Sequence, residues 1–316
     1  MRSVVVPALA VIALASTSAA LAGCSAFSGD EGSADDDGVR VATGFYPLQF
    51  VAERVGGDLV SVDNLTVPGQ EPHDLELTIK ETATLAQADL VVFEQGFQPA
   101  VDDAVETSAV GAVVDAAEVV ELRPAEEDPQ QHEEHAEEEE HDHGDLDPHF
   151  WQDPMLLADL GDEVASTLAE IDEDHADEYA ANAADLRDDL ERLNASYTGG
   201  LLDCERDTVV VSHDAFGYLE RYGLHFEPIA GLSPDAEPTP SDLARLQQLI
   251  DEEGITTVFG ERLAPPALAD TLASDADVTT AVLDPVEGLT DETEDEDYLS
   301  LMAANLVALR EANGCP

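Results

Sequence analysis

The sequence predicts an α/β protein of two lobes, each built on a four-stranded, mainly parallel sheet with flanking helices. Short runs rich in β-branched residues recur in both halves of the chain, and helix-compatible segments separate them, as in parallel α/β domains. One long amphipathic helical region lies between the halves and predicts a rigid connection. A binding site is therefore expected in the cleft between the two lobes.

The strand-like segments are short and spread over both halves. The first half contains residues 39–43, 59–67, 89–93 and 112–120, and the second half contains residues 208–211, 225–229, 255–259 and 278–283. Residues 39–316 suffice for two domains, since a domain usually spans about 100 to 200 residues.

Between the halves, residues 154–193 are rich in Ala, Leu, Asp and Glu, and apolar residues recur at spacings of three or four. These residues are Leu156, Leu160, Val164, Leu168 and Ile171. Such spacing predicts an amphipathic helix. No Gly or Pro follows residue 171 until Gly199, so a linking helix over residues 169–199 is expected to run unbroken. The lobes are then residues 39–168 and 200–316, with a last helix at 294–312.

The N-terminal segment predicts export from the cytoplasm. Arg2, an apolar run and a small-residue stretch are typical of a signal peptide, here over residues 1–23. The following Leu21-Ala22-Gly23-Cys24 resembles the lipobox of bacterial lipoproteins, which implies that Cys24 anchors the chain to membrane lipid. Residues 24–38 would then form a flexible tether. The alternative is an uncleaved transmembrane helix over residues 4–21, which Pro7 disfavours.

The chain is strongly acidic, with 71 Asp and Glu against 12 Lys and Arg. Nucleic acid is therefore excluded as a partner, because its phosphates need a basic surface. With Cys24 assigned to the anchor, Cys204 and Cys315 remain as one pair in an oxidising compartment, and a disulfide between them is expected. The alternative is two free thiols.

Four residues with metal-binding side chains fall near strand ends: His73, His149, His213 and Asp284. Ligands of α/β folds collect beyond the carboxyl ends of the strands, so these four side chains can converge in the cleft. Three imidazoles and a carboxylate make a tetrahedral set that favours Zn²⁺, followed by manganese or iron. The alternative is that each is merely a loop or capping residue.

Several motifs resemble the zinc/manganese substrate-binding lipoproteins of metal ABC importers, and the resemblance covers residues 39–315. The matching stretches are Phe45-Tyr46-Pro47, Glu71-Pro72-His73-Asp74, Asp147-Pro148-His149-Phe150-Trp151, Ser212-His213-Asp214-Ala215-Phe216-Gly217-Tyr218, Gly231-Leu232-Ser233-Pro234-Asp235-Ala236-Glu237-Pro238 and Leu283-Asp284-Pro285. The resemblance implies that His73, His149, His213 and Asp284 bind the metal.

The resemblance also implies a function. His213 stands where manganese-binding members often carry Glu, so Zn²⁺ is favoured as the transported ligand and Mn²⁺ is the alternative. Such a protein is not an enzyme: it delivers its ion outside the cytoplasm to the membrane permease of the importer. A monomer is the default expectation, and the oligomeric state stays open. Adhesion is a further role linked to relatives. The rival class is a zinc hydrolase, which would need an open coordination position for water.

Residues 126–147 form an acidic, low-complexity segment with twelve acidic residues and no Lys or Arg. Its composition predicts a solvated loop. The resemblance implies that its histidines form an accessory metal-collecting loop; they are His132, His135, His141 and His143. The alternative is a charge run that happens to contain His.

Overall fold

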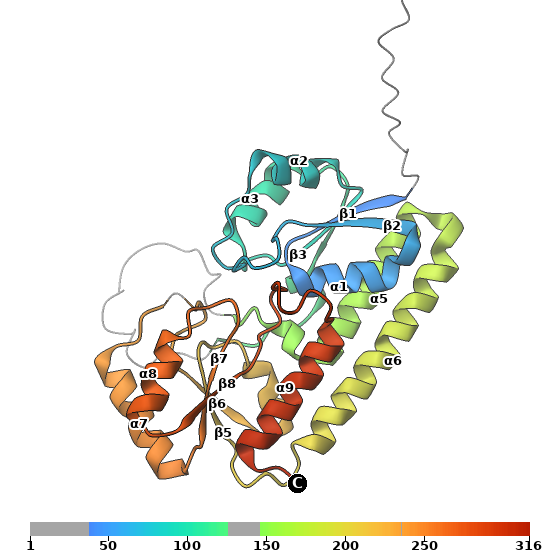
Figure 1. Cartoon of the computed structure of the whole chain (residues 1–316). Helices are drawn as coiled ribbons and strands as arrows, with labels where there is room; N and C mark the ends of the chain where they lie inside the picture. Colours follow the sequence, from blue (N-terminus) through green and yellow to red (C-terminus); the bar gives the residue numbers. More distant parts are fainter. Residues whose placement is uncertain (1–37, 126–145, 235) are drawn as a thin grey trace, which may run out of the picture. The chain divides into compact units, whose positions relative to one another are not determined.

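The computed structural model describes residues 38–125, 146–234 and 236–316. Residues Gly38–Pro316 form one compact unit, which contains two four-stranded sheets (Figure 1). The predicted signal peptide, Cys24, the tether and the four histidines of the acidic segment lie outside the described residues. Within the described ranges, no helix combines the length and the apolar character needed to span a membrane.

The first sheet has the strand order β2-β1-β3-β4, and all its pairings are parallel. Its strands are β1 (Val39–Thr43), β2 (Val60–Asn64), β3 (Leu90–Phe93) and β4 (Ala112–Asp115). The chain leaves β1 for β2 on one side and then crosses to β3 on the other side. The strand order thus reverses beside β1, and ligands of open α/β sheets bind at such switch points.

The second sheet repeats this topology with the order β6-β5-β7-β8, again with parallel pairings throughout. Its strands are β5 (Thr208–Val211), β6 (His225–Pro228), β7 (Thr257–Gly260) and β8 (Thr279–Val282). The switch point lies beside β5, which places the segment after β5 at a favoured ligand position.

Helices cover both faces of each sheet, since successive strand residues point to opposite sides and most are apolar. The helices are α1 (Tyr46–Gly56), α2 (Ile79–Gln87), α3 (Pro99–Ser108), α4 (Ala116–Val119), α5 (Pro154–Ile171), α6 (Ala176–Gly200), α7 (Pro240–Glu253), α8 (Ala267–Asp275) and α9 (Tyr298–Asn313). In the first sheet, Val91 packs toward α2 and α3. In the second sheet, Val210 and Val258 pack toward α7 and α8.

The opposite faces of the two sheets share one hydrophobic cluster. Val41 and Val92 of the first sheet and Val209 and Val211 of the second belong to it, together with residues of α1, α5, α6 and α9. Buried apolar area of this kind stabilises by roughly 25 cal/mol per Å². The two sheets are therefore joined by a continuous core and not only by a linking chain.

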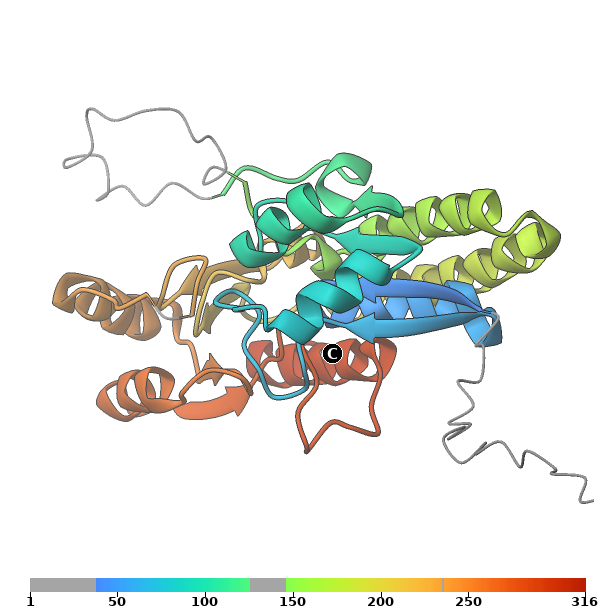
Figure 2. The same ribbon diagram turned by 90° about the horizontal axis from the view of Figure 1, so that it is seen from above.

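The predicted helical region between the halves consists of two helices, and the second is the expected long linking helix. α5 ends at Ile171, a short 3₁₀ turn (Glu173–His175) follows, and α6 runs unbroken from Ala176 to Gly200. The two helices lie side by side (Figure 1, Figure 2). Asp172 ends α5 and accepts a hydrogen bond from the Tyr179 hydroxyl of α6 at 3.0 Å.

The fold class is confirmed, with shifts at element ends. The strands expected at 39–43 and 208–211 have those bounds. The strand expected at 112–120 is wrong beyond Asp115, because the Asp115 carboxylate accepts a hydrogen bond from Ala117 N and caps α4. The disulfide between Cys204 and Cys315 is present.

Candidate metal centre

His73 lies in the connection between β2 and α2, which a buried glutamine holds in place. Gln98 is 2% exposed and donates from Nε2 to the Pro72 carbonyl at 3.1 Å and to Thr66 Oγ1 at 2.9 Å. The Thr66 hydroxyl in turn donates to the Gly44 carbonyl, just after β1, at 2.7 Å. The segment before His73 is thereby fixed to the carboxyl end of the first sheet.

His149 and His213 are each oriented by a carboxylate behind the ring. The Asp147 Oδ1 atom lies 2.8 Å from His149 Nδ1 and also accepts from His149 N at 3.0 Å. The Glu261 Oε1 atom lies 2.8 Å from His213 Nδ1. Because β5 and β7 are adjacent parallel strands, His213 and Glu261 leave the sheet side by side. Such carboxylates fix the tautomer, so that Nε2 faces the centre as an acceptor.

The three imidazoles converge on one carboxylate oxygen, which belongs to Glu287. Its Oε1 atom lies 3.6 Å from His73 Nε2, 3.4 Å from His149 Nε2 and 3.3 Å from His213 Nε2. One ligand atom from each of the four residues lies within 4.8 Å of the others. All four atoms are buried and lack a hydrogen-bond partner among the described residues. An ion at their centre would satisfy every one of them.

Burial and neighbouring charges act against each other in this cluster. Burial lowers the pKa of His213, but Glu261 and Glu287 outweigh it and raise the pKa to about 10. The pKa of His149 is likewise raised, because Asp147 and Glu287 outweigh burial. Burial would raise the pKa of Glu287, yet the three imidazoles hold that pKa well below its usual range. The carboxylates therefore require positive charge at the centre, which a divalent cation supplies.

Asp284, predicted as the fourth ligand, is not part of this cluster. Its Oδ2 atom accepts from Arg262 Nε at 3.0 Å, and its Oδ1 atom accepts from Val286 N at 2.8 Å. Asn305 fixes the Asp284 backbone through both N–H and C=O. Val286 then turns the chain with a φ of 60°, which is strained for a β-branched residue. Asp284 thus holds the turn that presents Glu287.

Conservative amide substitutions can distinguish the role of Glu287 from that of Asp284. Glu287→Gln is expected to weaken binding of a divalent metal ion at the cluster about 100-fold, whereas Asp284→Asn should weaken it about tenfold, as for groups that orient a ligand. In the Glu287→Gln background the second substitution should add little, because its effect passes through Glu287. Competition titration against a chelator measures each affinity. The reverse order of effects would return Asp284 to the ligand set.

Sequence reasoning gave no role to Glu261 or Glu287. The only sequence signal for Glu287 is a second acidic residue three positions after Asp284. Trp151 and Tyr218 pack against the ligand loops: Trp151 Nε1 donates to the Pro285 carbonyl at 2.8 Å, and the Tyr218 hydroxyl donates to the Asp147 carbonyl at 2.8 Å.

The remaining two histidines of the described residues, His175 and His225, lie outside the cluster. His175 pairs with Asp172 at the start of α6, and His225 pairs with Glu220 and Glu227 around β6. Both imidazoles are about half exposed. Neither belongs to the group of metal-binding side chains formed by the described residues.

A pocket of about 350 Å³ borders the cluster on the side of His73, with Glu94, Phe97, Asp115 and Glu118 among its lining residues. Glu94 is 2% exposed, and neither of its carboxylate oxygens has a hydrogen-bond partner among the described residues. Burial raises the pKa of Glu94 well above its ordinary value of 4.5, and the charges of Asp147 and Asp115 add to this shift.

Glu94→Gln is expected to stabilise the metal-free protein at neutral pH. Glu94 favours the folded state when it is protonated, because its pKa is higher in the folded than in the unfolded chain. Its contribution to the free energy of unfolding is therefore fully present below about pH 4.5. It is lost as the pH rises toward the folded-state pKa, by up to about 1.4 kcal/mol per pH unit. Glutamine lacks this penalty, so the free energy of unfolding should rise by about 1–2 kcal/mol at pH 7.5 and by nothing at pH 4. Urea denaturation at both pH values tests this, with Glu118→Gln as the exposed control. An equal difference at both pH values would contradict it.

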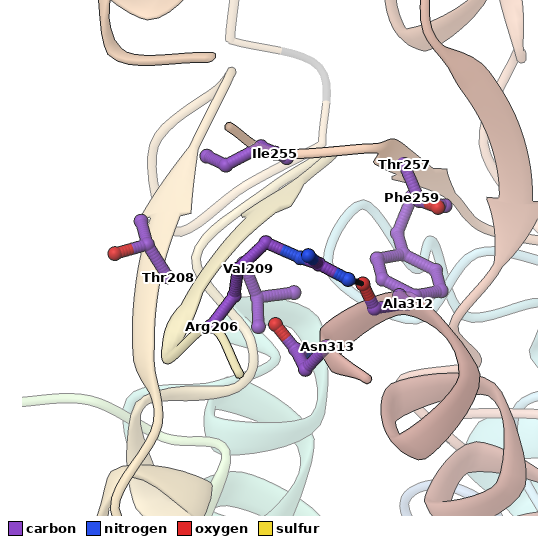
Figure 3. A pocket seen from close by; sticks show the side chains of 8 residues that line it. All are labelled: Arg206, Thr208, Val209, Ile255, Thr257, Phe259, Ala312 and Asn313. Atoms are coloured by element: carbon purple, nitrogen blue, oxygen red, sulfur yellow. Dashed lines mark hydrogen bonds between the residues drawn. The ribbon is translucent and has the colours of Figure 1, made fainter. Parts of the chain in front are cut away.

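A smaller cavity of about 10 Å³ lies at the amino ends of β5 and β7 (Figure 3). Arg206 crosses it and donates from Nη2 to the Ala312 carbonyl at 3.0 Å. Its described lining residues include no carboxylate and no imidazole. This cavity is a packing feature at the end of the sheet opposite the cluster.

Paired parallel sheets, with buried imidazoles and a carboxylate gathered beyond their strand ends, define the class of two-lobed binding proteins. Residues 41–312 match the family model described as zinc-uptake complex component A, periplasmic. The chain belongs to this family.

Individual relatives support this assignment. The chain is 34% identical over 289 residues to the zinc-binding lipoprotein AdcA of Streptococcus pneumoniae, covering 87% of this chain but 56% of AdcA. It is 33% identical to the high-affinity zinc uptake system protein ZnuA of Bacillus subtilis, covering 90% and 91% of the two chains. The laminin-binding protein Lmb of Streptococcus agalactiae, described as having adhesin and metal transporting activity, superposes with a TM-score of 0.76 at 27% identity, covering 87% of this chain and 99% of that one. The chain thus spans about half the length of the first of these relatives.

Proposed function

We propose that this chain captures Zn²⁺ outside the cytoplasm and delivers it to the membrane permease of an ABC-type importer. His73, His149, His213 and Glu287 are the proposed ligands. The observation that carries the proposal is the convergence of three buried Nε2 atoms and one carboxylate oxygen within 4.8 Å of one another. Family membership and the zinc-binding names of the relatives support the same cargo.

Zinc fits this donor set better than manganese or iron does. Imidazole nitrogens suit zinc, whereas manganese prefers carboxylate and water oxygens. Manganese or iron remains the alternative cargo. A hydrolase is disfavoured, because four protein ligands close the tetrahedral shell and leave no position for a reacting water.

Lipid anchoring through Cys24 and a monomeric state complete the proposal. The lipobox-like sequence Leu21-Ala22-Gly23-Cys24 supports the anchor, as does the name lipoprotein of a relative. The four histidines of the acidic segment are proposed to collect metal weakly for the central site. Only the central cluster, built from described residues, is needed for tight binding.

Metal content and competition test the cargo on a soluble form that starts at Gly38, since Gly38–Pro316 form a compact unit on their own. One tightly held zinc is expected, which about a 100-fold excess of Mn²⁺ does not displace. A matched variant with glutamine at His132, His135, His141 and His143 should keep this ion. Ready displacement by Mn²⁺ would replace zinc by manganese as the cargo, and loss of the ion from the glutamine variant would move the tight site to the acidic segment.

A further inference from the structure

The four residues of the buried cluster differ in their exposure to solvent. The His149 and His213 side chains are completely buried and that of Glu287 is 1% exposed, whereas the His73 side chain is 11% exposed. His73 also lines the pocket of about 350 Å³ that contains Glu94. Among the described residues, this pocket therefore borders the one ligand that solvent reaches.

The Glu94 carboxylate requires a neutralising partner. An isolated ionised carboxylate is costly to bury, and both oxygens of Glu94 lack a hydrogen-bond donor among the described residues. None of the described lining residues of the pocket is Lys or Arg. Two partners remain: a proton, or a cation that enters the pocket from solvent.

The pocket wall favours a cation over an anion. The buried Glu94 and the half-buried Asp115 contribute carboxylates and His73 contributes an imidazole, whereas Glu118 is exposed at the rim. Carboxylate walls in a low-dielectric pocket concentrate cations locally. Among the described residues, however, only the His73 cluster brings three or more metal-binding side chains close enough to enclose an ion. A cation beside Glu94 would therefore keep most of its water and be held more weakly than in the cluster.

We propose that the Glu94 pocket is a transit site, in which Glu94 is the first protein ligand of the incoming Zn²⁺ before His73 receives it. This inference rests on the proposed zinc function. The ion displaces the proton of Glu94 to solvent, and the carboxylate replaces one water of the hydrated ion. The three imidazoles and Glu287 then replace Glu94 and the remaining waters, Glu94 takes up a proton from solvent again, and the four ligands hold the ion more tightly than a single carboxylate can.

A transit site changes rates but not the final equilibrium, because it lowers the barrier equally for entry and exit. The test measures zinc association and dissociation by stopped flow on the full mature chain. Trp151 is the sole tryptophan of the chain and its ring centroid lies 5.2 Å from that of His149, so its fluorescence reports occupancy. Glu94→Gln mimics the protonated acid and preserves its shape. Glu118→Gln removes one carboxylate from the exposed rim of the same pocket and is the matched control.

Glu94→Gln is expected to slow association and dissociation by the same factor, about tenfold, the lower end of the rate gain that a carboxylate-lined pocket gives an incoming cation. The dissociation constant should then stay within about twofold of the parent, and Glu118→Gln should change association less than about twofold. Glu94→Asp, which keeps the carboxylate, should recover part of the rate. Two outcomes would overturn the transit site and leave the proposed zinc function standing. One is that Glu94→Gln and Glu118→Gln give equal rates, and the other is that Glu94→Gln speeds dissociation without changing association. Failure of the parent to bind zinc tightly would overturn the proposed function and the transit site with it.

Discussion

Replacing His213 with alanine is expected to weaken zinc binding by about 100-fold or more. Protein zinc sites of four ligands bind with about 10–16 kcal/mol, so that one ligand accounts for about 3 kcal/mol. A loss of that size is a factor of more than about 100 in the dissociation constant. The substitution also leaves Glu261 buried without its imidazole partner, which adds to the cost. Competition against a chelator of known affinity measures the change.

His225→Ala is the matched control for this experiment. His225 lies in β6 of the same sheet, its side chain is 55% exposed, and its partners are Glu220 and Glu227 and not the cluster. Its removal should leave zinc affinity unchanged. If the His213→Ala variant and the parent bind zinc with equal affinity, His213 is not a ligand. The closed shell of four protein ligands would then be wrong as well.

Loss of the disulfide is expected to lower the free energy of unfolding by about 4 kcal/mol, as for a bridge that closes a loop of about 100 residues. Cys204 and Cys315 are 111 residues apart in sequence, so the bridge restricts the unfolded chain strongly. Urea denaturation of the metal-free Cys204→Ser/Cys315→Ser protein, compared with the oxidised parent, measures the difference.

Zinc affinity should be nearly unaffected by the same double substitution. Cys204 precedes β5 and Cys315 follows α9, whereas His213 follows β5 at its other end. Sites this well separated act independently, so the dissociation constant should remain within about twofold of the parent. A stability loss below about 1 kcal/mol would show that other contacts at this end, such as Arg206 with the Ala312 carbonyl, already restrain the chain.

Much of the fold follows from the sequence because its central strands are short and largely apolar runs. Val39–Thr43 and Thr208–Val211 are central strands of this kind, and their bounds could be predicted. The break between α5 and α6 could not, because no Gly or Pro marks it. Asp172 ends α5 and pairs with the His175 ring and the Tyr179 hydroxyl, and local side-chain contacts of this kind compete with a helix without a Gly or Pro to mark them.

The candidate site, like the fold, can be predicted from the sequence only in part. His73, His149 and His213 follow from the rule that ligands gather beyond strand ends, and the structure brings these three together. The rule cannot choose between Asp284 and Glu287, since both follow β8. That choice depends on Arg262 and Asn305, which occupy the carboxylate and backbone of Asp284 and lie more than 20 positions away in sequence.

The hydrophobic cluster shared by the two sheets limits how this chain can be divided. Val41 and Val92 of one sheet and Val209 and Val211 of the other are buried in a single core with α1, α5, α6 and α9. A fragment cut after α5 would expose the apolar face that α6 and α9 cover. The two halves share a topology, yet they cannot be exchanged between relatives as independent modules: a chimera has to carry the interlocking helices along with the sheet they cover.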